Sequence, residues 1–356
     1  MAENHMPDPR GRERTAVWAV TRIGAQLGRA LAKALGGELL APADLAGEFG
    51  AAPYDAIVPA VAARFTDYRA HVFVAASGIV VRAVGSLLKG KDVDPAVVVV
   101  DQRGRFAVSL VSGHLGGAND LAREVAAVTA GAAVITTATD VEDLPAVDQL
   151  ARERGLTVAN VAAIKPVNVA VLAGDTIQVL DPEGHLGLAG APEDWLERFN
   201  FLPDASAWVA GRPGVWVTWR AMEPAEGMLV LHPVCLAVGV GCHRGVGADE
   251  IAAAVTGVLD EHGLALASVL GLASITAKAD EPGLLEAAGR LGRGLFFYDA
   301  AALAEMDVKN TSETVKKHMG VGSVSEASAL KLAGGGALLV EKCIKGDVTV
   351  AVALAG

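Results

Sequence analysis

The residues with the clearest chemical potential lie in one glycine-rich stretch, residues 112–119, which reads SGHLGGAN. The stretch follows an apolar run and precedes a helical pattern, so it predicts a loop at a helix N-terminus. Backbone N–H groups at such a terminus, with the side chains of Ser112 and Asn119, can donate hydrogen bonds to an anion. His114 is the residue of this stretch that titrates near neutral pH, which makes it the candidate acid or base.

The alternative interpretation of the same stretch is a tight turn. In that case the glycines only serve the turn, Asn119 caps the following helix and His114 is simply exposed. No Gly-Lys-Ser/Thr follows the glycines, so a loop that binds a nucleoside triphosphate is disfavoured. The sequence leaves both interpretations open.

A second candidate loop, VGVGCHRGVGADE at 238–250, also leads from a strand into a helix. Its glycine spacing does not fit the G-x-G-x-x-G fingerprint of dinucleotide-binding folds. We therefore expect a second anion-binding loop, in which Arg244 clamps a carboxylate.

The third candidate, ITAKADEPGLLE at 275–286, places Lys278, Asp280 and Glu281 just before a helix. A lysine at this position can hold a carboxylate or polarise a carbonyl group. The structural alternative is equally open: Asp280 is a natural N-cap and Pro282 a natural first-turn residue.

The fourth candidate, ASGIVVRAV at 76–84, has Gly78 at a strand end and Arg82 one helical turn later. Its alternative is an ordinary surface arginine. The segment TATD at 137–140 ends a further strand. Open α/β sheets bind ligands at the carboxyl ends of their strands, so the strand-end loops of this half, 112–119 included, are expected to converge at one edge.

Strands and helices that alternate along the chain must position these loops. The first part predicts strands at 15–21, 55–58, 70–76 and 132–137, helices at 23–35, 78–88 and 119–130, and a β-hairpin formed by 96–101 and 105–111. The last part predicts strands at 236–242 and 294–298, an apolar segment at 269–277, helices at 247–263, 282–292, 312–320 and 324–334, and a closing pair at 336–343 and 347–354. The alternation indicates an α/β fold.

The predicted architecture is two α/β domains with mostly parallel sheets, joined by a smaller irregular or β-containing middle segment. The expected boundaries are a disordered tail at 1–14, an N-terminal domain at 15–141, a variable middle segment at 142–234 and a C-terminal domain at 235–356. The clearest strands of the middle segment are 214–220 and 228–232.

Composition narrows the classes of partner. The net charge is −11 and no basic stripe occurs, which argues against nucleic acid. No apolar run reaches the roughly 18 residues of a membrane span, and the N-terminus lacks the apolar core of a secretory signal. An anionic small molecule is compatible with this charge if backbone N–H groups and a few arginines meet it locally. The oligomeric state stays open, a homodimer included.

Cysteine usage predicts a reducing, cytoplasmic location. Cys235, Cys242 and Cys343 are odd in number and form no C-x-x-C pair, so no disulfide framework is expected. Together with His232 and His243, the first two suggest zinc, but the spacing matches no standard zinc motif. No metal site is predicted.

Several of these stretches together resemble one known family. GIVVRAV, SGHLGGANDLAREVA, VITTATDV, VGVGCHRGVGADEI, ASITAKADEPGLLE and VGSVSEASAL resemble segments of the cobalt-precorrin-5A hydrolase family of anaerobic cobalamin biosynthesis. The resemblance covers about 71–141 and 236–352, and 142–234 fits the family's variable middle region. One departure is His243, where family members usually have a second basic residue.

The resemblance implies a hydrolase that acts on a carbon–carbon bond of a cobalt-bound corrinoid. The substrate's ring-A acetate lactone would be opened with water and a two-carbon unit released as acetaldehyde, giving cobalt-precorrin-5B. The cobalt belongs to the substrate, so no cofactor is expected. The expected partners are this anionic corrinoid and other enzymes of the cobalamin pathway.

Within that reaction we expect His114 to be the base or acid, with ligation of the cobalt as its alternative role. Lys278, Asp280 and Glu281 are expected to face it across a domain cleft and to assist carbon–carbon fragmentation. The predicted substrate-binding residues are Gly78, Arg82, Ser112, Gly113, Gly116, Gly117, Asn119 and Arg244. The competing functions are a non-catalytic corrinoid carrier, which would release no acetaldehyde, and a nucleotide-binding oxidoreductase, which would bind NAD or NADP.

Overall fold

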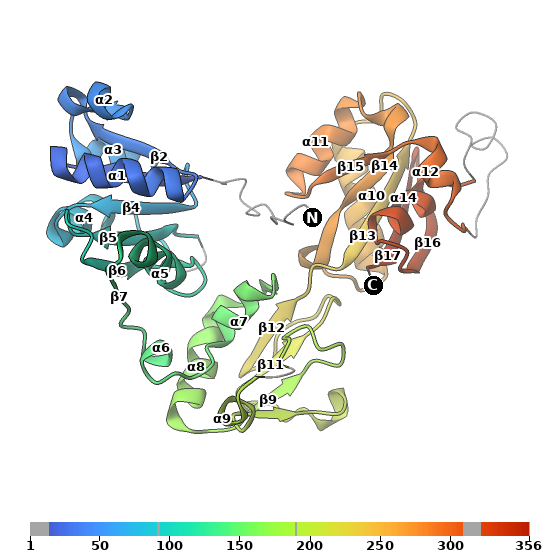
Figure 1. Ribbon diagram of the computed structural model, residues 1–356. Helices are drawn as coiled ribbons and strands as arrows, with labels where there is room; N and C mark the ends of the chain where they lie inside the picture. The colour runs from blue at the N-terminus through green and yellow to red at the C-terminus, as the bar shows by residue number, and fades with distance from the viewer. Residues whose placement is uncertain (1–13, 91–92, 189–190, 309–321, 356) are drawn as a thin grey trace. The chain divides into compact units, whose positions relative to one another are not determined.

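The computed structural model describes residues 14–90, 93–188, 191–308 and 322–355 (Figure 1). The chain forms two compact units. The first contains the described residues of Met1–Glu153, Ile164–Thr176 and Pro192–Arg198, and the second those of Arg154–Ala163, Ile177–Ala191 and Phe199–Gly356. Apart from Arg14, the predicted tail lies outside the described residues, as does the predicted helix at 312–320.

The first unit is built on a seven-stranded sheet in the order β3-β2-β1-β4-β5-β6-β7. Its strands are β1 (Thr15–Ala19), β2 (Glu38–Pro42), β3 (Ala52–Tyr54), β4 (Ala70–Val74), β5 (Ala96–Val100), β6 (Phe106–Val111) and β7 (Ala132–Val134). β1 to β5 pair in parallel, β6 is antiparallel to β5, and β7 is parallel to β6. The predicted hairpin of β5 and β6 is therefore confirmed.

Helices cover both faces of this sheet (Figure 1). They are α1 (Arg22–Ala34), α2 (Ala43–Phe49), α3 (Ile57–Arg64), α4 (Ser77–Val84) and α5 (Ala118–Thr129). Strand side chains such as Val17 and Val98 pack with α1 and α5, whereas Trp18 and Phe73 pack with α3 and α4. Burial on both faces is typical of parallel strands with near-continuous apolar sequence.

One predicted strand of this domain is wrong. The segment 55–58 begins α3, and β2, α2 and β3 were not predicted. A run of three apolar residues after Asp55 fits a strand and a buried helix equally well, and its length alone could not decide between them.

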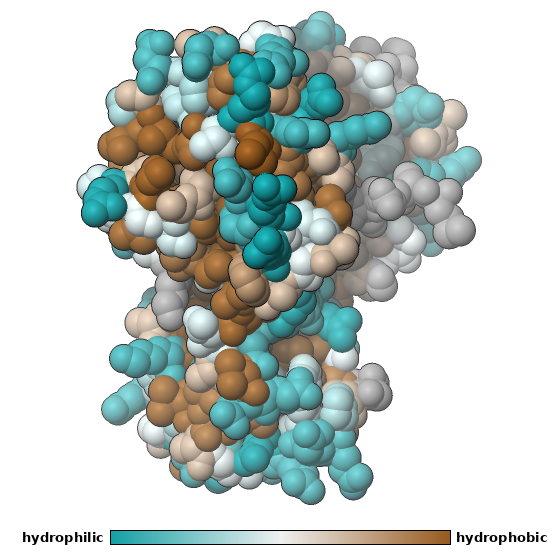
Figure 2. Space-filling view, turned by 60° about the vertical axis from the view of Figure 1, so that its left-hand side comes forward, coloured by the Kyte–Doolittle hydropathy of each residue, from teal (hydrophilic) through white to brown (hydrophobic). Residues whose placement is uncertain are grey.

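Apolar side chains also reach the surface of this domain. Figure 2 shows brown, apolar patches between teal, charged side chains on the face that it turns to the viewer. The exposed apolar residues on α3, on α4 and in the segment after α4 are Val58, Ile79, Val81, Leu88 and Val93. The first unit is completed by α6 (Ala138–Val141), α7 (Val147–Glu153), α8 (Ile164–Ala173) and α9 (Glu193–Leu196).

The second unit contains two five-stranded sheets. One has the order β10-β9-β11-β12-β8, with β8 (Thr157–Val158), β9 (Ile177–Leu180), β10 (Phe199–Phe201), β11 (Gly214–Val217) and β12 (Met228–His232). Its strands are parallel except for β8. The predicted strand at 228–232 is confirmed, and the one predicted at 214–220 forms over 214–217. The middle segment is more regular than its Gly- and Pro-rich sequence predicts.

The other sheet has the order β15-β14-β13-β17-β16. Its strands are β13 (Leu236–Cys242), β14 (Val269–Ile275), β15 (Leu295–Tyr298), β16 (Ala337–Lys345) and β17 (Val348–Leu354), and its helices include α10 (Ala248–Glu261), α11 (Pro282–Arg290), α12 (Ala300–Ala304) and α14 (Val324–Leu332). β13, β14 and β15 are parallel, and β17 is antiparallel to β13. The predicted α/β class with mostly parallel sheets is confirmed. None of the described helices is long and apolar enough to cross a membrane.

Candidate functional site

The 112–119 loop connects β6 to α5 and is folded upon itself. The N–H of Gly117 donates to the carbonyl of His114 at 2.9 Å, that of Ala118 to Ser112 at 3.0 Å, and that of Asn119 to Gly113 at 3.0 Å. These three N–H groups are therefore satisfied within the loop. The anion-binding interpretation required them to point at a ligand, and they do not.

The glycines of this loop make room for the loop itself. A Cβ at Gly116 would overlap the Cβ of Ser112, and one at Gly113 would lie 2.8 Å from Oδ1 of Asn119. Gly117 has φ 83°, in the left-handed region that glycine adopts without strain. The tight-turn interpretation is thus right for the glycines. It is wrong for Asn119, because the N-cap of α5 is Gly117 and no side chain caps the helix.

His114 lies between two carboxylates. Its Nε2 is 2.9 Å from Oδ2 of Asp140 and its Nδ1 is 3.2 Å from Oδ2 of Asp148. The side chain is only 9% exposed, so the expectation of a simply exposed histidine is wrong. Since a carboxylate only accepts hydrogen bonds, both ring nitrogens can donate at once when the imidazole is protonated.

The electrostatics of this cluster favour the charged imidazole. Burial opposes its charge, but the hydrogen bonds and charges of Asp148 and Asp140 outweigh burial and hold the pKa of His114 above its ordinary value of 6.5. Burial likewise opposes ionisation of both aspartates, yet their contacts with His114 hold the pKa of each below 3.8. The contacts thus favour an imidazolium between two carboxylates.

A shell of polar side chains orients Asp140. Nδ2 of Asn119 donates to its Oδ2 at 2.9 Å, and Arg123 donates to its Oδ1 at 2.5 Å. Asn119 is itself fixed, because it accepts from Ser109 at 2.6 Å and donates to Thr137 at 3.0 Å. The loops after β6 and β7 are thus joined as predicted, with Asn119 as the link.

Asp148 is oriented from a different element. Nδ2 of Asn168, on α8, donates to its Oδ1 at 2.8 Å. Neither Asp148 nor Asn168 was predicted, because both come from the segment taken as variable and no motif links them to His114. The one available signal was that Asp148 lies among Val147, Leu150 and Ala151 on the buried face of α7; a buried acid needs a partner.

Gly78 and Arg82 do not join this cluster. They follow β4, which runs parallel to β5, whereas β6 is antiparallel to β5. The loops after β4 and β6 therefore lie at opposite edges of the sheet, and the predicted convergence is wrong because the hairpin reverses the chain. Arg82 is exposed and donates to the carbonyl of Gly78, one turn earlier in its helix, at 2.9 Å.

In the second unit, the loops after the parallel strands β13 and β14 meet. Nη1 of Arg244 is 3.2 Å from Asp280, and its Nη2 donates to the carbonyl of Ala277 at 3.0 Å. The N–H of Gly245 donates to Oε1 of Glu281 at 2.7 Å. The carboxylate of Glu281 therefore accepts the hydrogen bond from a loop N–H group that was expected to bind a carboxylate of the ligand.

Lys278 and Glu281 form a buried ion pair. Their charged groups are 3.6 Å apart, and the two side chains are 6% and 4% exposed. The N-cap of α11 is Glu281, not Asp280 as the structural alternative held, and Pro282 occupies the first turn as expected. Two cations, Arg244 and Lys278, are thus matched by two carboxylates.

Cysteine and histidine residues form no metal centre in the part of the chain that the structure describes. His243, the departure from the resembled family, places Nδ1 3.0 Å from Asp347. Burial raises the pKa of the Cys242 thiol and lowers the pKa of His232. The thiols of Cys235, Cys242 and Cys343 are all free.

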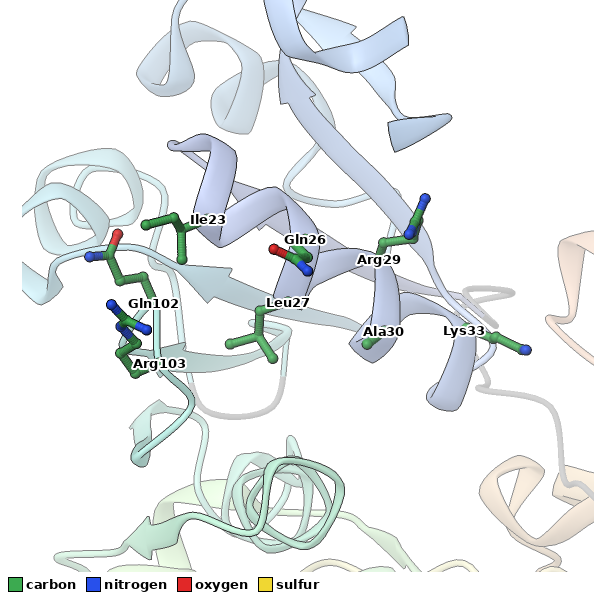
Figure 3. A pocket seen from close by; sticks show the side chains of 8 residues that line it. All are labelled: Ile23, Gln26, Leu27, Arg29, Ala30, Lys33, Gln102 and Arg103. Atoms are coloured by element: carbon green, nitrogen blue, oxygen red, sulfur yellow. The ribbon is translucent and has the colours of Figure 1, made fainter. Parts of the chain in front are cut away.

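A shallow groove of about 700 Å³ runs along α1 beside the β5–β6 turn (Figure 3). Its lining residues are Ile23, Gln26, Leu27, Arg29, Ala30, Lys33, Gln102 and Arg103. Three of these are cationic and none is acidic, which suits an anionic group. None of the predicted site residues lines this groove.

Comparison with known proteins identifies a family whose regions match this chain. Residues 59–140, 145–233 and 236–353 match the N-terminal, central and C-terminal regions described for cobalamin synthesis G. The chain is 33% identical over 304 residues to a cobalt-precorrin-5A hydrolase of Priestia megaterium, covering 82% of this chain and 79% of that relative. The chain belongs to the cobalamin synthesis G family.

Further relatives agree with this family membership. A cobalt-precorrin-5A hydrolase of Salmonella typhimurium is also 33% identical over 304 residues, covering 82% of this chain and 83% of that protein. Protein CobE of a Sinorhizobium species is 38% identical over 121 residues, covering 33% of this chain and 79% of its own. The predicted resemblance to the cobalt-precorrin-5A hydrolases is confirmed.

The regions of the cobalamin synthesis G family divide the His114 cluster between them. His114 and Asp140 belong to the region matched as N-terminal, 59–140, whereas Asp148 and Asn168 belong to the central region, 145–233. The central region of this family member thus contributes polar groups to the cluster around His114.

Proposed function

We propose that this chain hydrolyses cobalt-precorrin-5A in cobalamin biosynthesis, opening the ring-A acetate lactone and releasing acetaldehyde to give cobalt-precorrin-5B. The observation that carries the proposal is its 33% identity, over 82% of the chain, to two relatives named as cobalt-precorrin-5A hydrolases. The cobalt would arrive with the substrate. The three free thiols fit a reducing cytoplasm, where we place the reaction.

The chemistry sets the proton transfers that the site must serve. Water adds to the lactone carbonyl carbon, the carbon–oxygen bond breaks, and a carboxylate and an alcohol remain. Loss of the alcohol proton then allows the carbon–carbon bond to break, with its electron pair passing into the conjugated macrocycle and the two-carbon unit leaving as acetaldehyde. The leaving lactone oxygen needs an acid, and the alcohol needs a base.

One residue suits both steps in turn. The imidazolium of His114 can protonate the leaving oxygen, and the neutral imidazole that results can take the alcohol proton. The hydroxyl of Ser112 has no hydrogen-bond partner among the described residues, so we assign it the stabilisation of the oxyanion. Gly113, Gly116 and Gly117 would shape the loop, and Asn119 would hold Asp140.

In the second unit we assign carboxylate binding to the exposed Arg244, which Asp280 holds in place. This pairing is a charge-assisted contact that an incoming carboxylate can share. Lys278 and Glu281 hold each other as a buried ion pair, and Arg82 lies at the opposite edge of its sheet from His114, so we assign these three residues no contact with the substrate.

Incubation of the purified protein with cobalt-precorrin-5A tests the proposal. Hydrolysis predicts acetaldehyde and a spectral change of the corrinoid, and the His114→Gln variant should lose about 10²-fold or more in rate. His185→Gln is the matched control, because His185 also contacts one carboxylate, Glu183, but in the second unit. A spectral change without acetaldehyde would favour the carrier, and binding of NAD or NADP the oxidoreductase.

A further inference from the structure

We propose that Asp148 is a positioning residue that holds Nδ1 of His114, with Asn168 fixing Asp148 in turn, so that Nε2 is the atom that transfers protons. This assignment rests on the proposed hydrolysis for its catalytic meaning. Its structural content, the choice between two ring nitrogens, stands on the geometry of the first unit alone.

The two carboxylates beside His114 differ in what else neutralises them. Asp140 accepts from Arg123 and from Asn119 as well as from the imidazole. Asp148 has a side chain that is 6% exposed, and within the described ranges the only cationic side chain within 4 Å of its carboxylate is His114. The buried charge of Asp148 therefore depends on the imidazole, whereas that of Asp140 does not.

This difference decides which contact can open. If Nε2 leaves Asp140, the carboxylate keeps its guanidinium and amide partners. If Nδ1 leaves Asp148, a buried carboxylate loses its only nearby cation, which is strongly unfavourable. The Nδ1 contact is thus the permanent one, and Nε2 is free to meet a substrate oxygen.

Asn168 fixes the orientation of Asp148. Its Oδ1 accepts from the N–H of Val147 at 3.0 Å, so its Nδ2 must face Oδ1 of Asp148, to which it donates at 2.8 Å. Oδ2 of Asp148 is then left for Nδ1 of His114. A backbone N–H of α7, an amide of α8 and a carboxylate of α7 thereby set the direction of the ring.

The charges that face this ring come from three helices. Arg123 and Asp120 project from α5, Asp140 from α6, and Asp148 and Arg152 from α7, where Arg152 also pairs with Asp120. Removing the carboxylate of Asp148 takes away one of the two negative charges in contact with the imidazole, so the titration of His114 should move to lower pH.

The decisive measurement is ¹⁵N NMR of the imidazole in the wild-type protein above the pH at which His114 loses its charge. We expect the neutral ring to keep its proton on Nδ1. A neutral ring protonated on Nε2 would overturn the assignment. This measurement needs no substitution and no substrate, so it separates this inference from the proposed hydrolysis.

Substitutions of Asp148 test its effect on the reaction rate. Asp148→Asn should lower the titration midpoint of His114, shift the limb of the pH–rate profile that His114 sets to lower pH, and reduce the rate about 10²-fold. Asp148→Glu should restore part of the rate and the higher midpoint. Asp143→Asn, which removes an exposed carboxylate from the same stretch of the chain, is the matched control. An Asp148→Asn protein with the wild-type rate and profile would contradict the role.

The contribution of Asn168 is tested separately. Asn168→Ala leaves both carboxylates in place but frees Oδ1 of Asp148, so the rate should fall while the titration midpoint of His114 changes less than in Asp148→Asn. An unchanged rate would remove Asn168 from the chain of contacts. If wild-type protein released no acetaldehyde, the hydrolysis would fail while the NMR result still decided the ring's orientation.

Discussion

Gly116 shows how a small residue can serve its own loop instead of a ligand. The sequence alone suggested that an anion approaches this backbone, but the space beside Gly116 is filled by Ser112. Both interpretations require small side chains, so the glycine pattern could not distinguish them. Only the packing of the loop could.

Substitution of Gly116 should therefore destabilise the fold. Gly116→Ala would force its Cβ into Ser112, and we expect a loss of about 1–3 kcal/mol in the free energy of unfolding. The control is Gly257→Ala in α10, where an added Cβ meets nothing within 4 Å and should stabilise by about 1 kcal/mol. Urea unfolding measures both, and equal effects would contradict the packing argument.

His114 should couple stability to pH. Its pKa is raised above 6.5 in the folded protein, so its stabilising contribution is complete below about pH 6.5 and is lost as the pH rises through the folded-state value. Urea unfolding of wild type and His114→Gln between pH 5 and 9 should show a difference that shrinks toward high pH. A constant difference would show that the charge of His114 adds nothing.

The two aspartates act at the other end of the pH range. Their pKa values lie below 3.8 in the folded state, so their contribution is present above about pH 3.8 and is lost as the pH falls through the lowered values. Asp148→Asn should therefore weaken the acid dependence of unfolding. An unchanged acid transition would show that Asp148 is not ionised in the folded protein.

At the scale of elements, the direction of each strand decides which loops meet. β13 and β14 are consecutive and parallel, so the loops that follow them meet at the same edge of the sheet. In the first unit the sequence pattern indicated the β5–β6 hairpin, but its consequence for Gly78 and Arg82 was missed. A hairpin reverses every later parallel strand of a sheet, and that information was available in the sequence.

Other contacts could not be read from the sequence. Asp148 and His114 are far apart along the chain and belong to segments with different patterns, so only the packing of α7 beside the loop brings them together. Likewise, the spacing of Lys278 and Glu281 permitted either a ligand site or an internal pair. Burial of both side chains supports the internal pair.

That internal pair predicts a double-variant result. Glu281→Gln leaves the buried Lys278 without its carboxylate and should cost about 3–5 kcal/mol of stability. The double variant Lys278→Met with Glu281→Gln should recover much of this loss, because the uncompensated charge is gone. Chemical denaturation of the wild type, the single variants Glu281→Gln and Lys278→Met and the double variant checks the coupling, and strictly additive losses would argue against a pair.

At the scale of the whole molecule, charge governs the encounter with the substrate. The protein carries a net charge of −11, and the proposed substrate is itself a polyanion. Salt screens the repulsion between them, so kcat/KM should rise as ionic strength increases from about 0.01 to 0.15 M, where the Debye length falls from about 30 to 8 Å. A falling kcat/KM would instead indicate that local cations, such as those of the α1 groove, dominate the approach.

The turn around Gly116, in which Ser112 fills the space beside the glycine, also links two sequence positions across relatives. Any homologue with a larger residue at the position of Gly116 must either reshape the turn or lose the side chain at the position of Ser112. Substitutions at these two positions should therefore appear together. Homologues that carry both substitutions should keep the fold of this turn, and with it His114 between Asp140 and Asp148.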